Sequence, residues 1–494
     1  MRSDGSGQER PRWTKAASGG APMRWRRFGV FACIALLGWL GSPASSRAAL
    51  PPEVTAALVR GPVGPDAWSV VVAEVGAAQP RWTHRADVLV NPASLMKLVT
   101  TQAALDLLGP AHAWTTTVYV DGAVRDGVLQ GSLYVKGAGD PKLVVERLWL
   151  LLRRVRQLGI QEVAGDIVLD RSAFQVPEVD PASFDGEPHR PYNVQPDALL
   201  VNFKSVALAF VPDAARGIAR IVAEPPLAGV AIDAAVPLDH SAPCGDWRGL
   251  LKPEFGEASR IRFRGAYPLA CGERTWQVAP ADPAGYNARA IEGMWRFLGG
   301  RIGGAVREGL VPATATPIGV SESPALAELI RDVNKYSNNT MAAQIFLTLG
   351  LVRHGVGTAE NGRRAVMEWA AARWPEAALQ LYVDNGSGLS RQSRITAALL
   401  ARMLQAAWAS PYMPEFVSSL PISGIDGTRR RAQGAAGASH LKTGSLRDVI
   451  AVAGYVLSAS GRRYVLVAIV NHPQAGAARG AIDALADWVA KDLP

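Results

Sequence analysis

The middle of the chain, from about residue 115 to about residue 315, differs in pattern from both flanks. It carries short runs of apolar and β-branched residues, such as TTTVYV from Thr115 and GDIVLD from Gly165, between turn residues Gly, Asp and Pro. Helical patterns dominate outside it, for example ITAALLARMLQAAWAS from Ile395. With 494 residues the chain is too long for one ordinary core. The sequence therefore predicts a β-rich region inserted into a second, helix-rich part.

The first 48 residues carry most of the basic excess. They hold eight Lys and Arg and two Asp and Glu residues, which accounts for +6 of the formal net charge of +9. The rest of the chain is only weakly basic, which argues against a nucleic-acid binder. A basic stretch from Met23 and a 13-residue apolar run, Gly29–Gly41, precede small residues at Ser46 and Ala48. This pattern predicts a secretory signal cleaved after Ala48, with an uncleaved anchor as the alternative. The true start, the first residue or Met23, stays open.

The chain has three cysteines. Cys33 lies in the apolar run and would leave with the signal. Cys244 and Cys271 flank a segment rich in Gly and Pro. In an exported protein such an even pair predicts a disulfide, and two free thiols are the alternative.

The segment NPASLMKLVT, Asn91–Thr100, separates Ser94 and Lys97 by three residues in a predicted core helix that ends at Gly109. We expect Asn91 to cap this helix, with Pro92 at its first position. Residues at i and i+3 are neighbours on one helix face. A lysine withdrawn from water can act as a base at neutral pH, and a serine hydroxyl needs such a base to become a nucleophile. The alternative is a surface lysine near a helix cap.

A second segment, YSNN, interrupts two helical patterns at Tyr336–Asn339. Ser337 and Asn339 would there aim a hydroxyl and an amide into a cleft. An ordinary polar turn between two helices is the alternative.

The third segment, HLKTGSL, spans His440–Leu446 and precedes a predicted hairpin. The two strands of this hairpin are DVIAVAGYVLSA and RRYVLVAIVNH, and the turn SGRR joins them. Lys442 and Thr443 offer a cation and a hydroxyl for a carboxylate, and Gly444 leaves room for a substrate along the strand edge. A polar turn is the alternative. We expect His440 to be structural rather than catalytic.

The three segments, in this order and in these settings, resemble the motifs of serine β-lactamases and penicillin-binding proteins. Ser94 and Ser337 are 243 residues apart, far more than a compact β-lactamase needs. That spacing resembles the class C low-molecular-mass penicillin-binding proteins, a D-alanyl-D-alanine carboxypeptidase/endopeptidase family. The resemblance spans roughly residues 50 to 475. Further stretches similar to this family are GAGDPKL (Gly137–Leu143), RPYNVQPDALLVNF (Arg190–Phe203), DNGSGLSR (Asp384–Arg391) and LPISGIDGT (Leu420–Thr428).

One motif can be aligned in two ways. Tyr336 and Asn338 also fit the Tyr-x-Asn of class C β-lactamases and related esterases. We prefer Ser337 and Asn339, because the long insertion and the late stretches go with the peptidase family. Tyr336 is then expected to be a packing residue.

The resemblance implies an α/β fold: a transpeptidase-like domain whose antiparallel sheet is flanked by helices, with a large β-rich two-domain insertion. We expect residues 1–48 to form the leader, 49–115 and 316–494 the transpeptidase-like domain, and 116–315 the insertion. The border between the two inserted domains stays open.

The implied function is that of a serine-type D-Ala-D-Ala carboxypeptidase and endopeptidase that cleaves peptidoglycan peptides through an acyl-serine intermediate. Ser94 would attack the carbonyl, Lys97 would take its proton, and Ser337, hydrogen-bonded to Lys97, would relay it to the leaving amine. The substrate-binding residues would be Asn339 for an amide, Lys442 and Thr443 for the terminal carboxylate, with Gly444 beside them, and the N–H groups of Ser94 and Ser445 for the oxyanion.

The implied partners are peptidoglycan stem peptides and cross-links, with β-lactams as covalent inhibitors and no nucleic acid. No metal or cofactor is implied, and the seven His residues show no ligand spacing. Asp185 and Glu187 would meet a cationic diamino-acid side chain or, as we expect, belong to a solvated loop. The implied location is the periplasm, with loose membrane association left open.

Two other functions compete with the peptidase. A β-lactamase or esterase would use the same nucleophile but release the acyl group rapidly. A binding protein without turnover is disfavoured by the three intact motifs. The balance of carboxypeptidase and endopeptidase action and the oligomeric state stay open.

Overall fold

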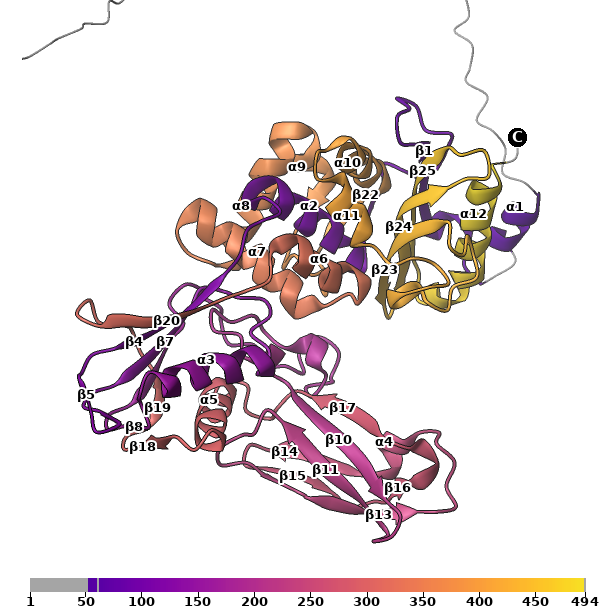
Figure 1. Cartoon of the computed structure of the whole chain (residues 1–494). Coiled ribbons are helices and arrows are strands. Elements are labelled where there is room, and N and C mark those ends of the chain that lie inside the picture. Colours follow the sequence, from indigo (N-terminus) through magenta and orange to yellow (C-terminus); the bar gives the residue numbers. More distant parts are fainter. Residues whose placement is uncertain (1–51, 60–61, 493–494) are drawn as a thin grey trace, which may run out of the picture. The chain divides into compact units, whose positions relative to one another are not determined.

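The computed structural model describes residues 52–59 and 62–492 (Figure 1). The predicted signal, its apolar run and Cys33 lie outside the described residues. Within the described ranges no helix is long and apolar enough to cross a membrane.

One antiparallel sheet joins the two ends of the chain. Its strands follow the order β2 (Trp82–His84), β1 (Trp68–Glu74), β25 (Arg463–Asn471), β24 (Val449–Leu457) and β23 (Ser439–Leu446). The predicted C-terminal hairpin is confirmed as β24 and β25. Because β1 pairs with β25, strands from the N-terminal and C-terminal parts of the described chain form one continuous sheet.

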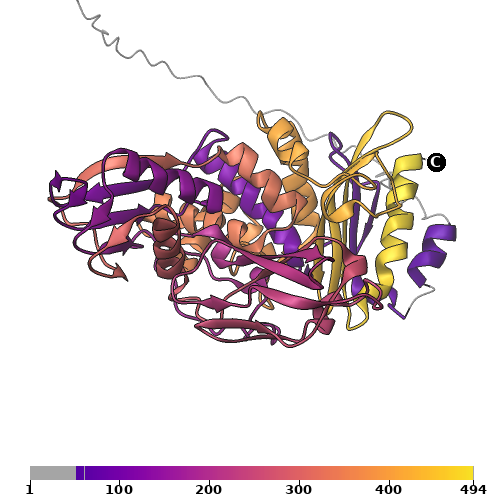
Figure 2. The ribbon, with the colours of Figure 1, turned by 60° about the horizontal axis from the view of Figure 1, so that its bottom comes forward.

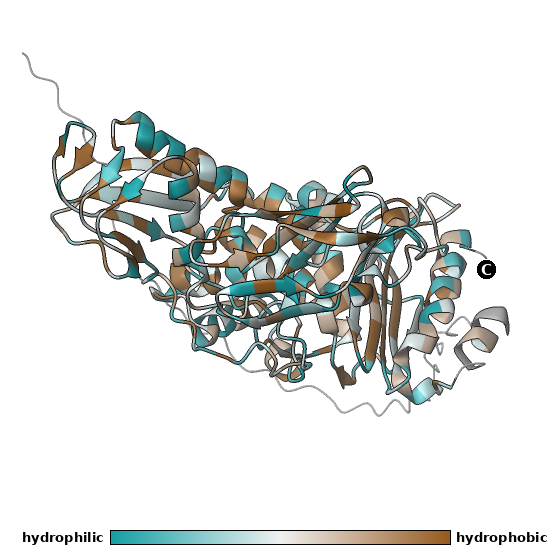
Figure 3. Cartoon of the chain, turned by 90° about the horizontal axis from the view of Figure 1, so that it is seen from below, coloured by the Kyte–Doolittle hydropathy of each residue, from teal (hydrophilic) through white to brown (hydrophobic). Residues whose placement is uncertain are grey.

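The two faces of this sheet pack against different helices. Ala451 and Ala453 of β24 belong to the core shared with the helices, whereas Ile450 and Val452 face the opposite side. Helix α12 (Arg479–Lys491) covers that opposite side, with α1 (Pro52–Val59) against α12. Both faces are buried, so the strands are hydrophobic along most of their length (Figure 3).

Helix α2 (Met96–Leu108) runs through the centre of the helical layer (Figure 2). Ten of its thirteen residues are buried, as its apolar sequence predicts. The surrounding helices are α6 (Leu326–Lys335), α7 (Asn339–His354), α8 (Ala359–Arg373), α9 (Ala377–Gln380), α10 (Ala397–Ala409) and α11 (Met413–Ser418).

The β-rich region leaves and rejoins this layer through two neighbouring strands. Strand β4 (Thr115–Val120) pairs antiparallel with β20 (Thr316–Glu322), although about 200 residues separate them. They belong to a sheet completed by β7 (Leu133–Gly137), β9 (Ile167–Asp170) and β19 (Val306–Glu308), packed with α3 (Val145–Gln157) and α5 (Tyr286–Phe297). A small adjoining sheet contains β5 (Val124–Arg125), β6 (Val128–Leu129), β8 (Glu162–Val163) and β18 (Arg301–Ile302).

Two further sheets lie within the same region. One contains β10 (Val206–Asp213), β11 (Ile218–Glu224), β13 (Ala235–Asp239), β16 (Tyr267–Pro268) and β17 (Arg274–Val278), and the other β12 (Ala231–Ile232), β14 (Pro253–Glu257) and β15 (Arg260–Phe263). The short helix α4 (Trp247–Leu250) lies beside them. Cys244 and Cys271 form a disulfide here, so the first of the two alternatives for this pair is confirmed. The domain boundaries at residues 115 and 315 stay a prediction.

Candidate active site

Ser94 lies in a 3-10 turn, η2 (Ala93–Leu95), directly before α2. The prediction that Asn91 caps the helix is wrong, because α2 begins only at Met96. The Asn91 side chain instead accepts a hydrogen bond from the N–H of Ala93 at 2.9 Å. Ala93 has a φ of 49°, a left-handed conformation that costs a non-glycine residue roughly 1–2 kcal/mol. The fold thus holds the residue before the serine in a strained turn.

Lys97 is completely buried and touches three oxygen atoms. Its Nζ lies 2.6 Å from Asn339 Oδ1, 2.6 Å from the Ser387 carbonyl and 3.1 Å from Ser94 Oγ. The first two are acceptors only, so a neutral amine donates its two N–H bonds to them. The remaining lone pair is then directed at the Ser94 hydroxyl.

Burial and the neighbouring Lys442 favour this neutral form. Removal from water, followed by the charge of Lys442, lowers the pKa of Lys97 well below its ordinary value. Lys442 is also fully buried, and burial lowers the pKa of Lys442 to about 7. The arrangement therefore favours a base at position 97 near neutral pH.

Ser337 pairs with a different lysine from the one expected. Its Oγ accepts a hydrogen bond from Lys442 Nζ at 2.8 Å, whereas the sequence predicted a bond to Lys97. Lys442 also donates to the carbonyl of Thr443 at 2.6 Å. The amide Asn339, rather than the hydroxyl of Ser337, is the residue of this motif that contacts Lys97.

The turn between α6 and α7 favours the alignment that we preferred. Ser337 has a φ of 58°, and the Asn338 side chain caps α7 by accepting from Met341 N. Asn338 therefore turns away from Lys97, whereas Asn339 turns toward it. The prediction that Tyr336 is a packing residue is wrong, because Tyr336 is 67% exposed and lines the hollow at Ser94.

The third motif lies on β23, at one edge of the central sheet. A Cβ atom on Gly444 would approach the carbonyl of Pro92 to 2.7 Å. The glycine is therefore required for close packing against the nucleophile turn, whereas the sequence had suggested only room for substrate. Thr443 Oγ1 lies 2.8 Å from Thr428 Oγ1, and Ser445 is exposed to the hollow.

The loop Asn385–Leu389 contributes a contact to Lys97 that the sequence did not predict. Asn385 Oδ1 accepts hydrogen bonds from Ser387 N, Ser387 Oγ and Gly388 N, and Asn385 Nδ2 donates to Leu389 O. These bonds orient the Ser387 carbonyl toward Lys97. Gly388, with a φ of 77°, lets the loop touch the Ala93 carbonyl. Asn385, Gly386 and Gly388 are typical turn residues, so the sequence indicates a turn here. It does not indicate that this turn contacts Lys97.

A hollow of about 740 Å³ opens above these groups. Ser94, Ser337, Asn339 and Ser445 all line it. The inserted region and two arginines complete its wall, through Phe184, Asp185, Tyr192, Arg391 and Arg447.

The inserted region is hydrogen-bonded to the catalytic motifs. Asn339 Nδ2 donates to the carbonyl of Tyr192 at 3.2 Å, which leaves its Oδ1 for Lys97. Some loss of hydration opposes ionisation of the exposed Asp185, but hydrogen bonds from Asn193, Tyr192 and the Glu187 N–H outweigh it and hold the pKa of that carboxyl below its ordinary value. Asp185 lines the hollow, whereas Glu187 forms an exposed ion pair with Arg190.

The side chains that could bind a metal ion, His440 included, are not clustered in the described part of the chain. Among the described residues no group of three or more His, Cys, Asp and Glu side chains could hold a metal ion. His440 is half-buried, and burial lowers the pKa of this imidazole from its ordinary value.

Known proteins resemble the chain over most of its length. It matches the D-Ala-D-Ala carboxypeptidase 3 (S13) family over residues 52–492. A D-alanyl-D-alanine carboxypeptidase from Actinomadura sp. (strain R39) is 30% identical over 442 residues, 84% of this chain and 80% of that protein. The D-alanyl-D-alanine carboxypeptidase DacB of Haemophilus influenzae is 24% identical over 400 residues, 77% of this chain and 80% of that protein.

Solved structures share the fold. Penicillin binding protein 4 (dacB) from Haemophilus influenzae matches with a TM-score of 0.68 at 21% identity, covering 88% of this chain and 98% of its own. A predatory peptidoglycan endopeptidase from Bdellovibrio bacteriovorus matches with a TM-score of 0.51 at 16% identity, covering 85% and 92%. The predicted fold class, a helix-flanked antiparallel sheet with an added β-rich region, is confirmed. The chain belongs to the D-Ala-D-Ala carboxypeptidase 3 (S13) family, as its three motifs had indicated.

Proposed function

We propose that this protein is a serine-type D-Ala-D-Ala carboxypeptidase and endopeptidase that acts on peptidoglycan peptides and binds penicillin. The observation that carries the proposal is the environment of Lys97. The Nζ atom of this buried lysine, whose pKa is lowered, lies within hydrogen-bond distance of Asn339 Oδ1, the Ser387 carbonyl and Ser94 Oγ, so the neutral amine can donate to the first two and accept from the Ser94 hydroxyl. This is the arrangement that an acyl-serine mechanism needs.

Acylation begins when Ser94 Oγ attacks the carbonyl carbon of the penultimate D-alanine and its proton moves to Lys97. The N–H groups of Ser94 and Ser445 stabilise the oxyanion. As the C–N bond breaks, the proton that Lys97 took passes to the leaving amine through Ser337, whose Oγ here accepts from Lys442 and turns toward Lys97 for this relay. Lys97 is then neutral again. Because Lys442 donates to Ser337 Oγ, the hydroxyl hydrogen of Ser337 must point away from that lysine.

The terminal carboxylate of the substrate binds near Thr443. Lys442 is buried behind Ser337, so it does not itself line the hollow. Its positive charge attracts the substrate carboxylate through space rather than by direct contact. Asn339 binds the substrate amide after a small displacement of the Tyr192 carbonyl that its Nδ2 now contacts. Water attacks the acyl-enzyme in the second step, with Lys97 again the base.

Asp185 supplies a specificity contact in the same hollow. Its carboxylate lies among the lining residues and has a lowered pKa, so it is negatively charged at neutral pH. It therefore favours a stem peptide whose third residue carries a free ammonium group. Glu187, paired with Arg190, is not part of this contact.

The protein is exported to the periplasm in this proposal, with residues 1–48 as its leader. Residues 49–115 and 316–494 form the catalytic domain, and residues 116–315 the insertion whose segment around Asp185 and Tyr192 lines the hollow. The partners are peptidoglycan stem peptides and cross-links, with β-lactams as covalent inhibitors.

Fluorescent penicillin followed by intact mass tests the proposal. We expect a long-lived adduct of one penicillin on Ser94 and none on a Ser94→Ala variant. Rapid release of hydrolysed drug would instead support a β-lactamase of the same fold. Peptide cleavage by the Ser94→Ala variant would refute the mechanism.

A further inference from the structure

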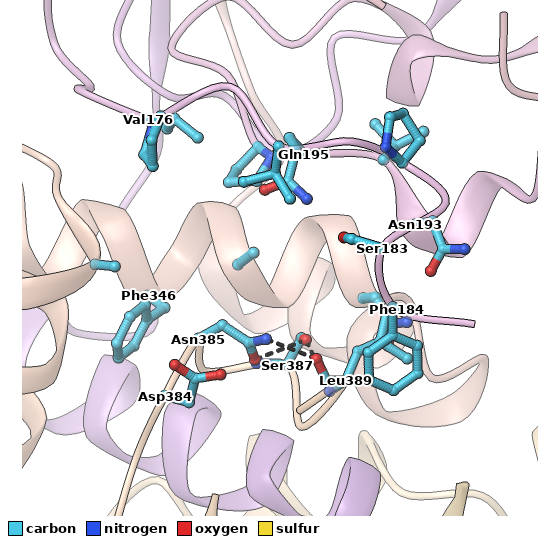
Figure 4. Close-up of a pocket in the computed structure, with 18 of the residues that line it drawn as sticks. Val176, Ser183, Phe184, Asn193, Gln195, Phe346, Asp384, Asn385, Ser387 and Leu389 are labelled. Atoms are coloured by element: carbon cyan, nitrogen blue, oxygen red, sulfur yellow. Dashed lines mark hydrogen bonds between the residues drawn. The ribbon is translucent and has the colours of Figure 1, made fainter. Parts of the chain in front are cut away.

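A second hollow of about 540 Å³ adjoins the active site (Figure 4). It lies between the inserted segment that carries Val176 and Gln195 and the loop that carries Asn385 and Ser387. Its volume falls in the range of about 300–1,000 Å³ that is usual for small-molecule sites. The hollow at Ser94 and this second one have Phe184, Tyr192, Asn339 and Leu389 in common, so the two are continuous.

Helix α7 forms one wall along the whole length of the second hollow. Asn339, Ala343, Phe346 and Leu347 line it, at the i, i+4, i+7 and i+8 positions of one helix face. From Asn339 to Leu347 the helix rises by about 12 Å, at 1.5 Å per residue. A ligand that reaches Asn339 from Ser94 can thus continue along α7.

The polar groups of this hollow are uncharged or acidic. Its lining residues include six carboxamide side chains but no Lys, Arg or His. Gln175, Gln195 and Gln392 make no side-chain hydrogen bond within the described part of the chain, so their amide groups are free to bind a ligand. The two carboxylates, Asp180 and Asp384, disfavour an anion.

Apolar and aromatic groups complete the surface. Phe346 lies opposite the segment of Gln195, and Phe184 stands near the shared boundary (Figure 4). Carboxamides that both donate and accept, set among apolar rings, fit a neutral ligand with many hydroxyl and acetamido groups. Asp384 lies near Phe346 (Figure 4), so this end of the hollow disfavours a carboxylate and favours a neutral group. These features together match an N-acetylated sugar.

We propose that the second hollow is a subsite for the glycan end of the substrate. The inference rests on the proposed function, in which the acyl group on Ser94 belongs to a peptidoglycan stem. Three residues separate that acyl residue from the sugar and span at most about 10–11 Å when extended. An extended stem of this length runs along α7 from Asn339 and places the sugar at the Phe346 and Leu347 end of the hollow. The enzyme therefore prefers stems that are still attached to the glycan.

The first test compares kcat/KM for a disaccharide-linked pentapeptide and for the same free pentapeptide. We expect the protein to favour the linked substrate by at least tenfold. An Ala343→Trp variant fills the hollow and should reduce this ratio to about one. Val352→Trp is the matched control, because Val352 lies on the same helix but is 54% exposed and outside the hollow. Equal kcat/KM values in the unaltered protein would overturn the proposal.

The second test measures binding without turnover. N,N′-Diacetylchitobiose, followed by saturation-transfer NMR, should bind the penicillin-acylated protein, and the Ala343→Trp variant should weaken it at least tenfold. No binding, or equal binding to the variant, would overturn the proposal. Competition by an unglycosylated stem tripeptide but not by the disaccharide would assign the hollow to peptide instead.

The two proposals fail in distinguishable ways. Protein that is stoichiometrically acylated by penicillin but ignores the sugar refutes only the glycan subsite. Protein that is never acylated refutes the proposed function, and chitobiose binding can still be measured on its unmodified form.

Discussion

Asn385 is predicted to control the reactivity of Ser94 although it does not touch the serine. Its side chain makes four hydrogen bonds within the loop that presents the Ser387 carbonyl to Lys97. An Asn385→Ala variant loses all four. The carbonyl then no longer holds one N–H of the lysine, and the lone pair of Lys97 is no longer directed at Ser94.

The size of the effect follows from the Lys97–Ser387 contact of 2.6 Å. A buried hydrogen bond to a lysine contributes about 1.5–3 kcal/mol. Its loss from the transition state corresponds to a roughly 10- to 150-fold slower acylation. The same carbonyl stabilises the ammonium form of Lys97, so its loss lowers the pKa of Lys97 further and moves the acid limb of the pH–rate profile to lower pH.

The assay is the rate of acylation by fluorescent penicillin from pH 5 to pH 10. An Asn385→Asp variant keeps the acceptor oxygens and adds a negative charge, so we expect partial recovery of the rate and a shift of the acid limb to higher pH. Asn361→Ala is the matched control, because Asn361 Nδ2 bonds to the Val356 carbonyl in another loop. An unaltered rate and acid limb in folded Asn385→Ala protein would refute the reasoning.

Three further predictions concern packing, pH and the disulfide. Gly444→Ala pushes β23 away from the nucleophile turn, so we expect a loss of about 1–3 kcal/mol in the free energy of unfolding and slower acylation; Gly480→Ala, whose added methyl group meets no atom within 4 Å, should acylate normally. Because the pKa of Lys442 is lowered to about 7, this lysine is charged below pH 7 and neutral above it; kcat/KM should therefore fall above about pH 7 for substrates with a terminal carboxylate, whereas an amidated substrate should show no such fall. Replacing Cys244 and Cys271 by Ser opens a loop with a sequence separation of 27, which should cost about 3.5 kcal/mol in thermal or urea unfolding; an unchanged unfolding midpoint would contradict the predicted contribution of the disulfide.

Short-range patterns in the sequence determined much of this protein. The i, i+3 spacing of Ser94 and Lys97 brings them together on any helix, and the apolar run around them predicts that the helix is buried. The change to a β-rich pattern near residue 115 and back near 315 predicts the insertion. The two apolar runs after residue 448 and the turn residues between them predict the hairpin β24–β25. Each of these depends on periods of two to four residues, which local backbone geometry fixes.

The tertiary structure alone decided how the motifs are connected. Lys97 meets Asn339 and the Ser387 carbonyl across 242 and 290 residues, and Ser337 meets Lys442 rather than Lys97. The Ser387 contact uses a backbone carbonyl, which every residue has, so no side-chain pattern identifies it. Tyr336 was expected to be a packing residue, yet its turn exposes it. Contacts between distant segments depend on how whole helices and strands pack against each other. Local sequence patterns do not determine that packing.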